Sequence, residues 1–416
     1  MRRIAMFFFV SILYFQTFAQ NNTFLDWKTD LDTLQNRLLS KDYLFYSISK
    51  NEFKNQINQL KSNVNLQSKA QTYWELKKII HSFKEINLTV AKENYTKFPF
   101  EIACFKKNYY VLKTHADFEF ILAKKLLAIN EIPIDKIVQR IKNSIPFSPK
   151  KLAYKSLLEF LDISKTDTLK LTLLCKDKKK LTVKIPFIQD FDEADLLEII
   201  PLKTPFYKEK KNRWFWMYGI NFGQQIFFKY NVGLSNEYFI KMKDSLGWTA
   251  LDCAKKYDMR LQSVYDAPKF SNFTKNLVRK FNKKRYKKLF IDLRGNKKGN
   301  ILALQSFIDK IKNIKRINKR NRIYLLVDKT IHSSGIKAIL AFKKQTKAIV
   351  IGEKFTGTIN DTDKMSSFYL PNSRFKISYP LLKLETITIK PKILVEYTIH
   401  HYINGIDPIL QKVLEQ

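Results

Sequence analysis

The sequence predicts a multidomain α+β protein whose C-terminal half is an α/β domain. Apolar residues recur at helical spacing up to about residue 95, and strand-like alternation starts near residue 98. From about residue 213, continuous apolar runs alternate with amphipathic segments, which is typical of βα units that cover both faces of a sheet. With 416 residues, 45% of them hydrophobic, the chain can build several cores. We expect a signal segment at 1–20, a helical domain at 21–95, a β-rich domain at 96–190 and the α/β domain at 191–416.

The first residues, MRRIAMFFFVSILYFQTFAQ, have the pattern of a secretory signal. Two arginines precede an apolar run that is too short to span a bilayer comfortably, and small or polar residues follow it. We expect cleavage after Ala19 or Gln20, export to the periplasm or the cell exterior, and no transmembrane segment in the mature chain.

The next segment, to residue 95, is predicted to be helical. In FLDWKTDLDTLQNRLL the leucines recur at helical spacing, and in SISKNEFKNQINQLK Ser49 is a candidate N-cap. A third helix is expected in TYWELKKIIHSF.

The region from 96 to 190 is predicted to be β-rich. FEIACFKKNYYVLKTH and LKLTLLCKDKKKLTVKIP both have the alternation and polar turn of a hairpin. Between them, LLAINEIPIDKIVQRIK indicates a strand, a turn and a helix, and it resembles that part of a PDZ domain. This resemblance implies a sheet edge that accepts a peptide as an extra strand.

After a linker expected at 187–212, the α/β region alternates strands and helices. RWFWMYGINFGQQIFFKYNVG, KKLFIDLRGN, RIYLLVDKT and KAIVIGE are the predicted strands, and FSNFTKNLVRKFN, ILALQSFIDKIK and GIKAILAFKKQ are the predicted helices. Three loops, at 292–300, 328–335 and 352–357, follow strands. Reactive groups collect on such loops, so we expect the functional site there.

Composition excludes several classes of function. The formal net charge is +37, but lysines are spread over the chain in solvated turns, so we do not expect nucleic acid as the partner. Three scattered cysteines and five histidines, without CxxC or HExxH, predict no metal site and no cofactor. Binding of an acidic polymer remains open as a function besides those considered below. Binding that weakens steeply as salt is raised would reveal it.

The stretch VDKTIHSSGIKAIL, residues 327–340, contains the candidate nucleophile. From local sequence alone, Ser333 or Ser334 is a helix N-cap. A serine at a helix N-terminus also has backbone amides and a dipole that favour a developing oxyanion.

Together, the three loops resemble the tail-specific, or C-terminal processing, serine peptidase family. The family pattern D-L-R-x-N-x-G-G, T-x-S-S-[AG] and G-E-x-T-x-G-K appears in order as FIDLRGNKKGN, LLVDKTIHSSG and AIVIGEKFTGT. The resemblance covers nearly the whole mature chain. It implies a ClpP/crotonase-like βα domain that acts on or binds extended polypeptide.

The resemblance assigns the nucleophile position to Ser333, with Ser334 as a secondary candidate. The lysine that acts as base in one branch of the family falls at Thr358, and the histidine of another branch falls at Asn87. Threonine cannot take up a proton near neutral pH. Lys354 is a candidate replacement base, whereas His332 adjoins Ser333 and is expected to point elsewhere.

The oxyanion loop implied by the resemblance also departs from the family pattern. It comprises Gly295, Asn296, Lys297, Lys298 and Gly299, in which two lysines replace glycines. Glycine tolerates positive φ and leaves amides uncovered, so the lysines are expected to narrow the approach to the amides. The sequence therefore leaves two functions open, an exported serine peptidase and a catalytically inactive relative that binds peptides.

Overall fold

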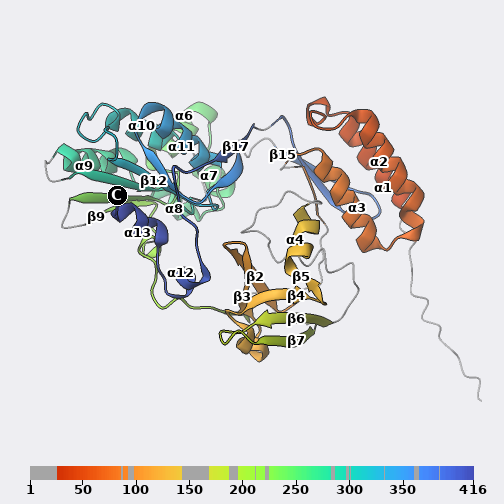
Figure 1. Ribbon diagram of the computed structural model, residues 1–416. Helices are drawn as coiled ribbons and strands as arrows, with labels where there is room; N and C mark the ends of the chain where they lie inside the picture. Colours follow the sequence, from red (N-terminus) through yellow and green to blue (C-terminus); the bar gives the residue numbers. More distant parts are fainter. Residues whose placement is uncertain are drawn as a thin grey trace, which may run out of the picture.

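The computed structural model describes most of the chain beyond the predicted signal. The described residues are 26–85, 88–91, 98–142, 168–186, 195–210, 212–220, 224–282, 286–296, 299, 301–331, 333–359, 365–383 and 385–416. The signal predicted at 1–20 lies outside them. Among the described helices, none has the length and apolar character that a membrane crossing requires. Figure 1 shows an N-terminal helical part, a β-rich part and an α/β part.

The helical part consists of three helices that pack on a small sheet. The helices are α1 (Trp27–Leu39), α2 (Lys50–Asn63) and α3 (Lys69–Ser82). Ser49 caps α2 as predicted, because its side chain accepts a hydrogen bond from the backbone N–H of Glu52. The sheet has the antiparallel order β1-β16-β15, made of β1 (Thr89–Ala91), β15 (Met365–Tyr369) and β16 (Lys376–Pro380).

A late segment of the chain thus completes the helical part, beside α3 (Figure 1). The buried carboxylate of Asp30 on α1 accepts hydrogen bonds of 2.7 Å from the backbone N–H groups of both Asn372 and Ser373. Phe375 packs against Trp27 and Tyr73 in the same core. The domain boundaries drawn at residues 20, 95 and 190 stay a prediction.

The β-rich part contains both predicted hairpins. Its sheet has the order β2-β3-β4-β6-β7, with β5 on β4 and β8 on β3. The Lys106 and Lys107 turn joins β2 to β3 with positive φ at both residues. The strand, turn and helix predicted in LLAINEIPIDKIVQRIK are present as β4, β5 and α4. The elements are β2 (Phe100–Phe105), β3 (Asn108–Thr114), β4 (Lys125–Ile129), β5 (Ile132–Pro133), α4 (Ile134–Lys142), β6 (Thr168–Leu174), β7 (Lys180–Pro186) and β8 (Leu197–Glu198).

The α/β part has a six-stranded sheet in the order β18-β13-β12-β11-β10-β9. All neighbouring pairs are parallel except β9–β10, which is antiparallel. The strands are β9 (Phe215–Ile220), β10 (Gln225–Tyr230), β11 (Lys288–Asp292), β12 (Ile323–Val327), β13 (Ile349–Gly352) and β18 (Ile393–Leu394). A separate antiparallel ribbon is formed by β14 (Phe355–Ile359) and β17 (Glu385–Ile389).

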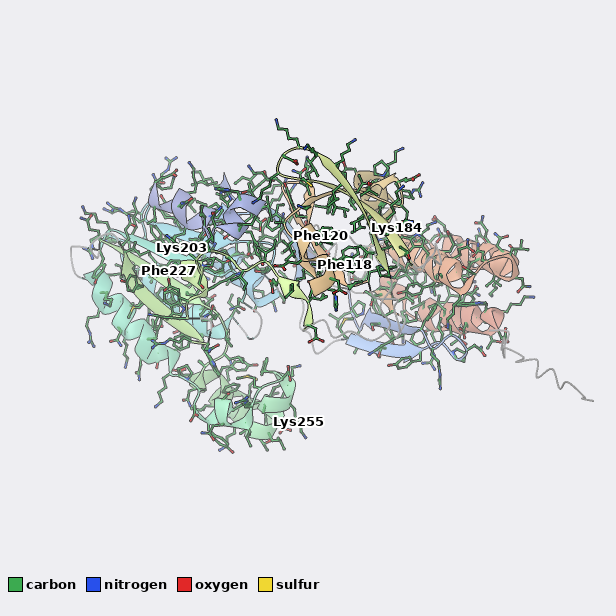
Figure 2. All side chains as sticks on the ribbon, turned by 90° about the horizontal axis from the view of Figure 1, so that it is seen from below. Phe118, Phe120, Lys184, Lys203, Phe227 and Lys255 are labelled. Atoms are coloured by element: carbon green, nitrogen blue, oxygen red, sulfur yellow. The ribbon has the colours of Figure 1, made fainter. Side chains whose placement is uncertain are left out.

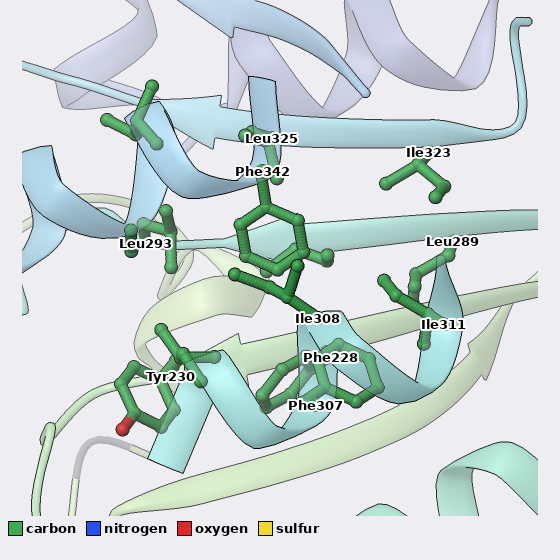
Figure 3. Close-up of a cluster of buried hydrophobic side chains, with 14 of the residues drawn as sticks. Phe228, Tyr230, Leu289, Leu293, Phe307, Ile308, Ile311, Ile323, Leu325 and Phe342 are labelled. Carbon is green, nitrogen blue, oxygen red and sulfur yellow. The ribbon is translucent and has the colours of Figure 1, made fainter. Parts of the chain in front are cut away.

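Helices cover both faces of this sheet. The α/β part contains the helices α6 (Asn236–Leu246), α7 (Ala250–Lys256), α8 (Leu261–Tyr265), α9 (Phe270–Asn282), α10 (Leu302–Ile311), α11 (Ser333–Gln345), α12 (Ile399–Ile403) and α13 (Pro408–Leu414), of which α9, α10, α11 and α13 pack on the sheet. The face toward α9, α10 and α11 buries Phe228, Phe307 and Phe342 among others (Figure 3). The opposite face buries Phe227 and Phe290 against Ile409 of α13. Because successive residues of a strand face opposite sides, each strand residue can be assigned to one of these two faces.

The short helices α6, α7 and α8 form a group with its own small core. In Figure 2 this group, which carries Lys255, projects from the rest of the α/β part. The sequence-based interpretation did not identify these helices.

The linker expected at 187–212 is wrong for its described residues, 195–210. β8 pairs with β3 there, and Phe206 packs against Trp216 and Phe227 at ring centroid distances of 5.4 and 5.1 Å. The charged residues and prolines of this segment had predicted an exposed connection. The packing of Phe206 instead holds the segment against the α/β part.

Candidate functional site

The three loop motifs meet at one edge of the α/β sheet. β11, β12 and β13 are parallel neighbours, so their carboxyl ends lie side by side. The loops after them begin at Leu293, Asp328 and Glu353. The three motifs therefore lie next to one another along this edge of the sheet, in the same order as in the sequence.

Ser333 is the first residue of α11, and its side chain is partly buried. The first backbone N–H groups of a helix have no partner inside the helix, so this position adjoins amides that favour negative charge. Ser334, the next residue, donates a hydrogen bond of 3.4 Å from its Oγ to Oδ1 of Asn296. The two candidate serines therefore lie at the start of α11, and Ser334 is directed toward the first loop.

The described residues of the first loop include two glycines at positive φ, Gly295 and Gly299. Gly295 has φ 66°, and its backbone N–H donates a 2.8 Å hydrogen bond to Oγ1 of Thr330. Asn296 is buried and donates from Nδ2 to the carbonyl of Tyr230 at 3.2 Å. Lys297 and Lys298 lie outside the described residues. The Gly295 amide is thus committed to Thr330, whereas an oxyanion hole needs amide donors directed at the substrate.

Gly299 closes the first loop against another glycine. Its φ is 114°, it forms a parallel bridge with Gly233, and an added Cβ would lie 2.1 Å from the carbonyl carbon of Gly233. A side chain cannot be accommodated there, so glycine is required for the close approach of the two backbones.

The second loop is built on Asp328 and Thr330. The Asp328 carboxylate is buried and accepts hydrogen bonds from the Thr330 backbone N–H, at 2.8 Å, and from the Thr330 hydroxyl. Because Thr330 also accepts from Gly295, a chain of hydrogen bonds joins the second loop to the first. The threonine of the family motif is therefore a structural connection between loops.

The third loop follows Gly352, the last residue of β13, which has φ 135°; a Cβ there would lie 1.9 Å from the carbonyl oxygen of Val327. The buried carboxylate of Glu353 forms an ion pair of 3.1 Å with Nζ of Lys329. Lys354 is exposed. This loop therefore presents to solvent the lysine that was a candidate base.

The position carried over from the family lysine, Thr358, lies on β14. Gly357 faces α11, because a Cβ on it would meet Cδ1 of Ile336 at 2.6 Å, one turn after Ser333. The hydroxyl of Thr356 instead lies 2.9 Å from that of Thr388 on β17, in an exposed environment. Since strand residues alternate, Thr358 shares the face of Thr356, opposite α11.

Two other candidates, Asn87 and His332, lie outside the described residues.

A buried network of charged side chains lies where β11 meets the first loop. Arg294 donates from Nε and Nη2 to Asp292, at 2.6 Å for the shortest contact, and from Nη1 and Nη2 to Asp407, at 2.7 Å each. Lys229 Nζ lies 3.3 Å from Asp292 and donates to the carbonyl of Arg294. The Arg294 guanidinium stacks 4.0 Å from the ring centroid of Tyr207. Asp292 and Arg294 are thus a buried structural pair.

The pKa values in this network follow from burial and neighbouring charge. Burial would raise the pKa of Asp292, but the Arg294 and Lys229 cations hold it below its usual value. Burial lowers the pKa of Lys229 and raises that of Tyr207 to about 12. A buried lysine with a lowered pKa is a possible proton acceptor in general.

The sheet separates Lys229 from Ser333. Lys229 alternates with Phe228 and Tyr230, which belong to the core under α9, α10 and α11. Its side chain therefore lies on the face that α13 covers, and α11 packs on the other face. Lys229 neutralises Asp292 instead of reaching the nucleophile position.

Sequence reasoning missed Lys229 and Asp407. A signal existed for each: Lys229 interrupts the apolar strand QIFFKY, and Asp407 precedes Pro408 as an N-cap does. Within the described residues, no group of three or more His, Cys, Asp or Glu side chains could hold a metal ion.

Comparison with known proteins supports the fold. No family model and no curated protein matches the sequence. Mature CPAF has a similar structure, with a TM-score of 0.56 and 11% identity over 92% of this chain and 94% of that chain. The complex of mature CPAF with lactacystin matches with a TM-score of 0.54 and 11% identity, over 93% and 96% of the two chains.

The photosystem II D1 C-terminal processing protease matches at a TM-score of 0.34 and 11% identity, over 88% of this chain and 93% of that chain. The similarity to mature CPAF shows the multidomain α+β fold that the loop motifs predicted. At this level of identity, the similarity concerns the fold alone.

Proposed function

We propose that this protein is an exported, tail-specific-peptidase-like protein that binds extended polypeptide without cutting it. The observation that carries the proposal is the position of Thr358. It has no proton-accepting group at neutral pH and shares the β14 face opposite α11. Lys354, the nearby alternative, is exposed, and the Gly295 amide is committed to Thr330. These features all work against activating Ser333 and stabilising an oxyanion.

Binding of polypeptide is supported by the β-rich part. Its sheet ends in β2 on one side and β7 on the other, and among the described residues β7 pairs only with β6. An extended peptide can add to such an edge through backbone hydrogen bonds, with side-chain pockets providing selectivity. The N-terminal signal pattern supports export.

The test combines binding with chemistry on the mature chain. We expect a fluorescent library of unstructured peptides to yield ligands with Kd of about micromolar order, and the bound peptides to stay intact on prolonged incubation. We expect Ser333→Ala to bind the same peptides equally well. Absence of binding to a diverse library would contradict the proposal.

A serine peptidase is the second candidate, favoured by the location of Ser333 at the N-terminus of α11. It requires cleavage of unstructured polypeptide that Ser333→Ala abolishes. It also requires labelling of Ser333 by a fluorophosphonate within roughly pH 6 to 10, the range in which lysine or histidine bases work. Labelling at Ser333 together with cleavage would replace the binding proposal with this one.

A further inference from the structure

The edge of the α/β sheet opposite the candidate site is formed by three helix-to-strand connections. α9, α10 and α11 end at Asn282, Ile311 and Gln345, and the parallel strands β11, β12 and β13 begin shortly after them. In a parallel sheet these connections all reach the amino ends of the strands, so they lie together and away from the loops that follow the strands.

All three connections are basic. We call residues 279–282, 286–288, 310–322 and 343–347 the basic edge; these ranges contain many Lys and Arg residues and no Asp or Glu. Residues 310–322 alone hold seven cationic side chains. Lys315, Lys319, Arg320, Lys343 and Lys347 are among those that are exposed.

Contacts hold the three connections next to one another. Arg322 on the second connection donates from Nη1 to the carbonyl of Lys287 on the first, at 3.0 Å. The backbone N–H of Lys347 on the third donates to Oδ1 of Asn318 on the second, at 2.8 Å. Burial lowers the pKa of Lys288, and the nearby Arg322 cation lowers it further. The three connections are therefore adjacent, and their cations gather at the same edge of the sheet.

Helix stability explains only part of this charge. Cations near a helix C-terminus interact favourably with the helix dipole, and Lys312, just after α10, also pairs with Asp309 at 2.8 Å. Lys315, Lys319 and Arg320, however, lie beyond the last turn of α10. Concentrating like charges there costs free energy of folding, which a bound polyanion would offset.

We propose that the basic edge docks the protein on an anionic membrane surface through the phosphate groups of lipids. Lysine outnumbers arginine in the basic edge, which suits attraction to a diffuse layer of phosphates. Single-stranded nucleic acid binding would use exposed aromatic side chains for stacking, and Phe281 and Tyr286 in the basic edge are buried. The predicted export signal would also bring the mature chain to a membrane surface.

Docking by the basic edge fixes how the protein faces the membrane. The strands between the two edges have four or five residues, about 15 Å at roughly 3.3 Å per residue. The loops that carry Ser333 would thus face away from the lipid. This inference is independent of whether Ser333 is catalytic.

The experiment is vesicle co-sedimentation of the mature chain. We expect binding to vesicles that contain phosphatidylglycerol, no binding to phosphatidylcholine vesicles, and loss of binding as salt is raised. Replacing Lys315, Lys319, Arg320 and Lys343 with glutamine should weaken binding about 5-fold for each charge removed.

The matched control removes four exposed lysines elsewhere, Lys28, Lys54, Lys176 and Lys184, the last on β7 (Figure 2). It should change binding less than about 3-fold, because these residues lie outside the basic edge. Equal weakening by both sets would overturn the proposal in favour of general charge attraction. Tighter binding to DNA than to anionic vesicles at equal phosphate concentration would overturn it in favour of nucleic acid. Circular dichroism of both variants establishes that each is folded.

Discussion

Arg294 and Asp407 form a two-pronged ion pair that joins the first loop to the C-terminal helix α13. Both contacts are 2.7 Å long, and both side chains are buried. Asp407 also caps α13 by accepting hydrogen bonds from the N–H groups of Ile409 and Leu410. The end of the chain therefore holds the guanidinium that follows β11, and with it the start of the loop.

Removal of the Asp407 carboxylate should destabilise the folded protein, because the buried positive charge of Arg294 would then be only partly neutralised. We expect Asp407→Ala to lower the free energy of unfolding by about 3 to 5 kcal/mol, measured by urea denaturation. Glu415→Gln provides the control, since Glu415 forms an exposed pair with Lys412 just after the same helix. It should cost less than about 1 kcal/mol. Similar losses in the two variants would show that Asp407 has no special role.

Gly352 should not tolerate a side chain. We expect Gly352→Ala to destabilise the protein by more than about 3 kcal/mol, because its Cβ would lie 1.9 Å from the Val327 carbonyl oxygen and β12 and β13 would have to separate. Gly247, the C-cap of α6, also has positive φ, but an added Cβ would meet nothing within 4 Å. Gly247→Ala should cost only about 1 kcal/mol in thermal unfolding. If Gly352→Ala lowered the stability as little as Gly247→Ala does, β12 and β13 would not be as close at Gly352 as the structure shows.

Glu237 should make stability depend on acidic pH. Burial opposes its ionisation, but hydrogen bonds from Ser271 and from the Phe270 N–H outweigh that effect and lower its pKa from 4.5 to about 2. An acid with a lowered pKa in the folded state stabilises the protein above its unfolded pKa and loses this contribution as the pH falls toward 2.

Glu237→Gln should therefore cost about 1 to 2 kcal/mol at pH 7, after allowance for the partial exposure of the carboxylate. The difference from the wild type should shrink as the pH falls below about 4, in chemical unfolding measured at several pH values. Glu209→Gln, at an exposed position, is the matched control for the removal of one negative charge. A difference that stays constant with pH would rule out an ionic contribution.

Restoring the family lysine at Thr358 should not restore chemistry. Because Thr358 shares the β14 face opposite α11, Thr358→Lys is expected to leave fluorophosphonate labelling of Ser333 unchanged. Labelling quantified by mass spectrometry, with Lys354→Ala as a charge control, checks this expectation. An increase of about tenfold or more would mean that the new amine reaches the serine and that the assigned face is wrong.

Local patterns predicted most of the elements correctly. Ser49 before a helical period predicted the cap of α2, and continuous apolar runs predicted β11, β12 and β13. The fold itself followed from the order of three loop motifs. These features are encoded by neighbours in the sequence, where periodicity and capping have direct physical causes.

The missed features depend on residues that are far apart in the chain. The partners of Asp30 lie at residues 372 and 373, and the partners of Arg294 include Asp407. No local pattern encodes such pairs. The face of Thr358 depends on strand alternation, in which a shift of one residue moves a side chain to the other side of β14. Matching a motif assigns Thr358 its position in the sequence, but it does not say on which face of β14 the side chain lies.

The return of residues 365–380 to the N-terminal helices raises the contact order of the helical part. α1, α2 and α3 are synthesised early, yet β15 and β16, which complete their core, lie at 365–380, and the amides that satisfy Asp30 come 342 and 343 residues after it. Contacts between such distant segments form slowly, because a long loop must close first. The helical part can therefore reach its final packing only after nearly the whole chain has emerged, which keeps it incompletely folded during synthesis.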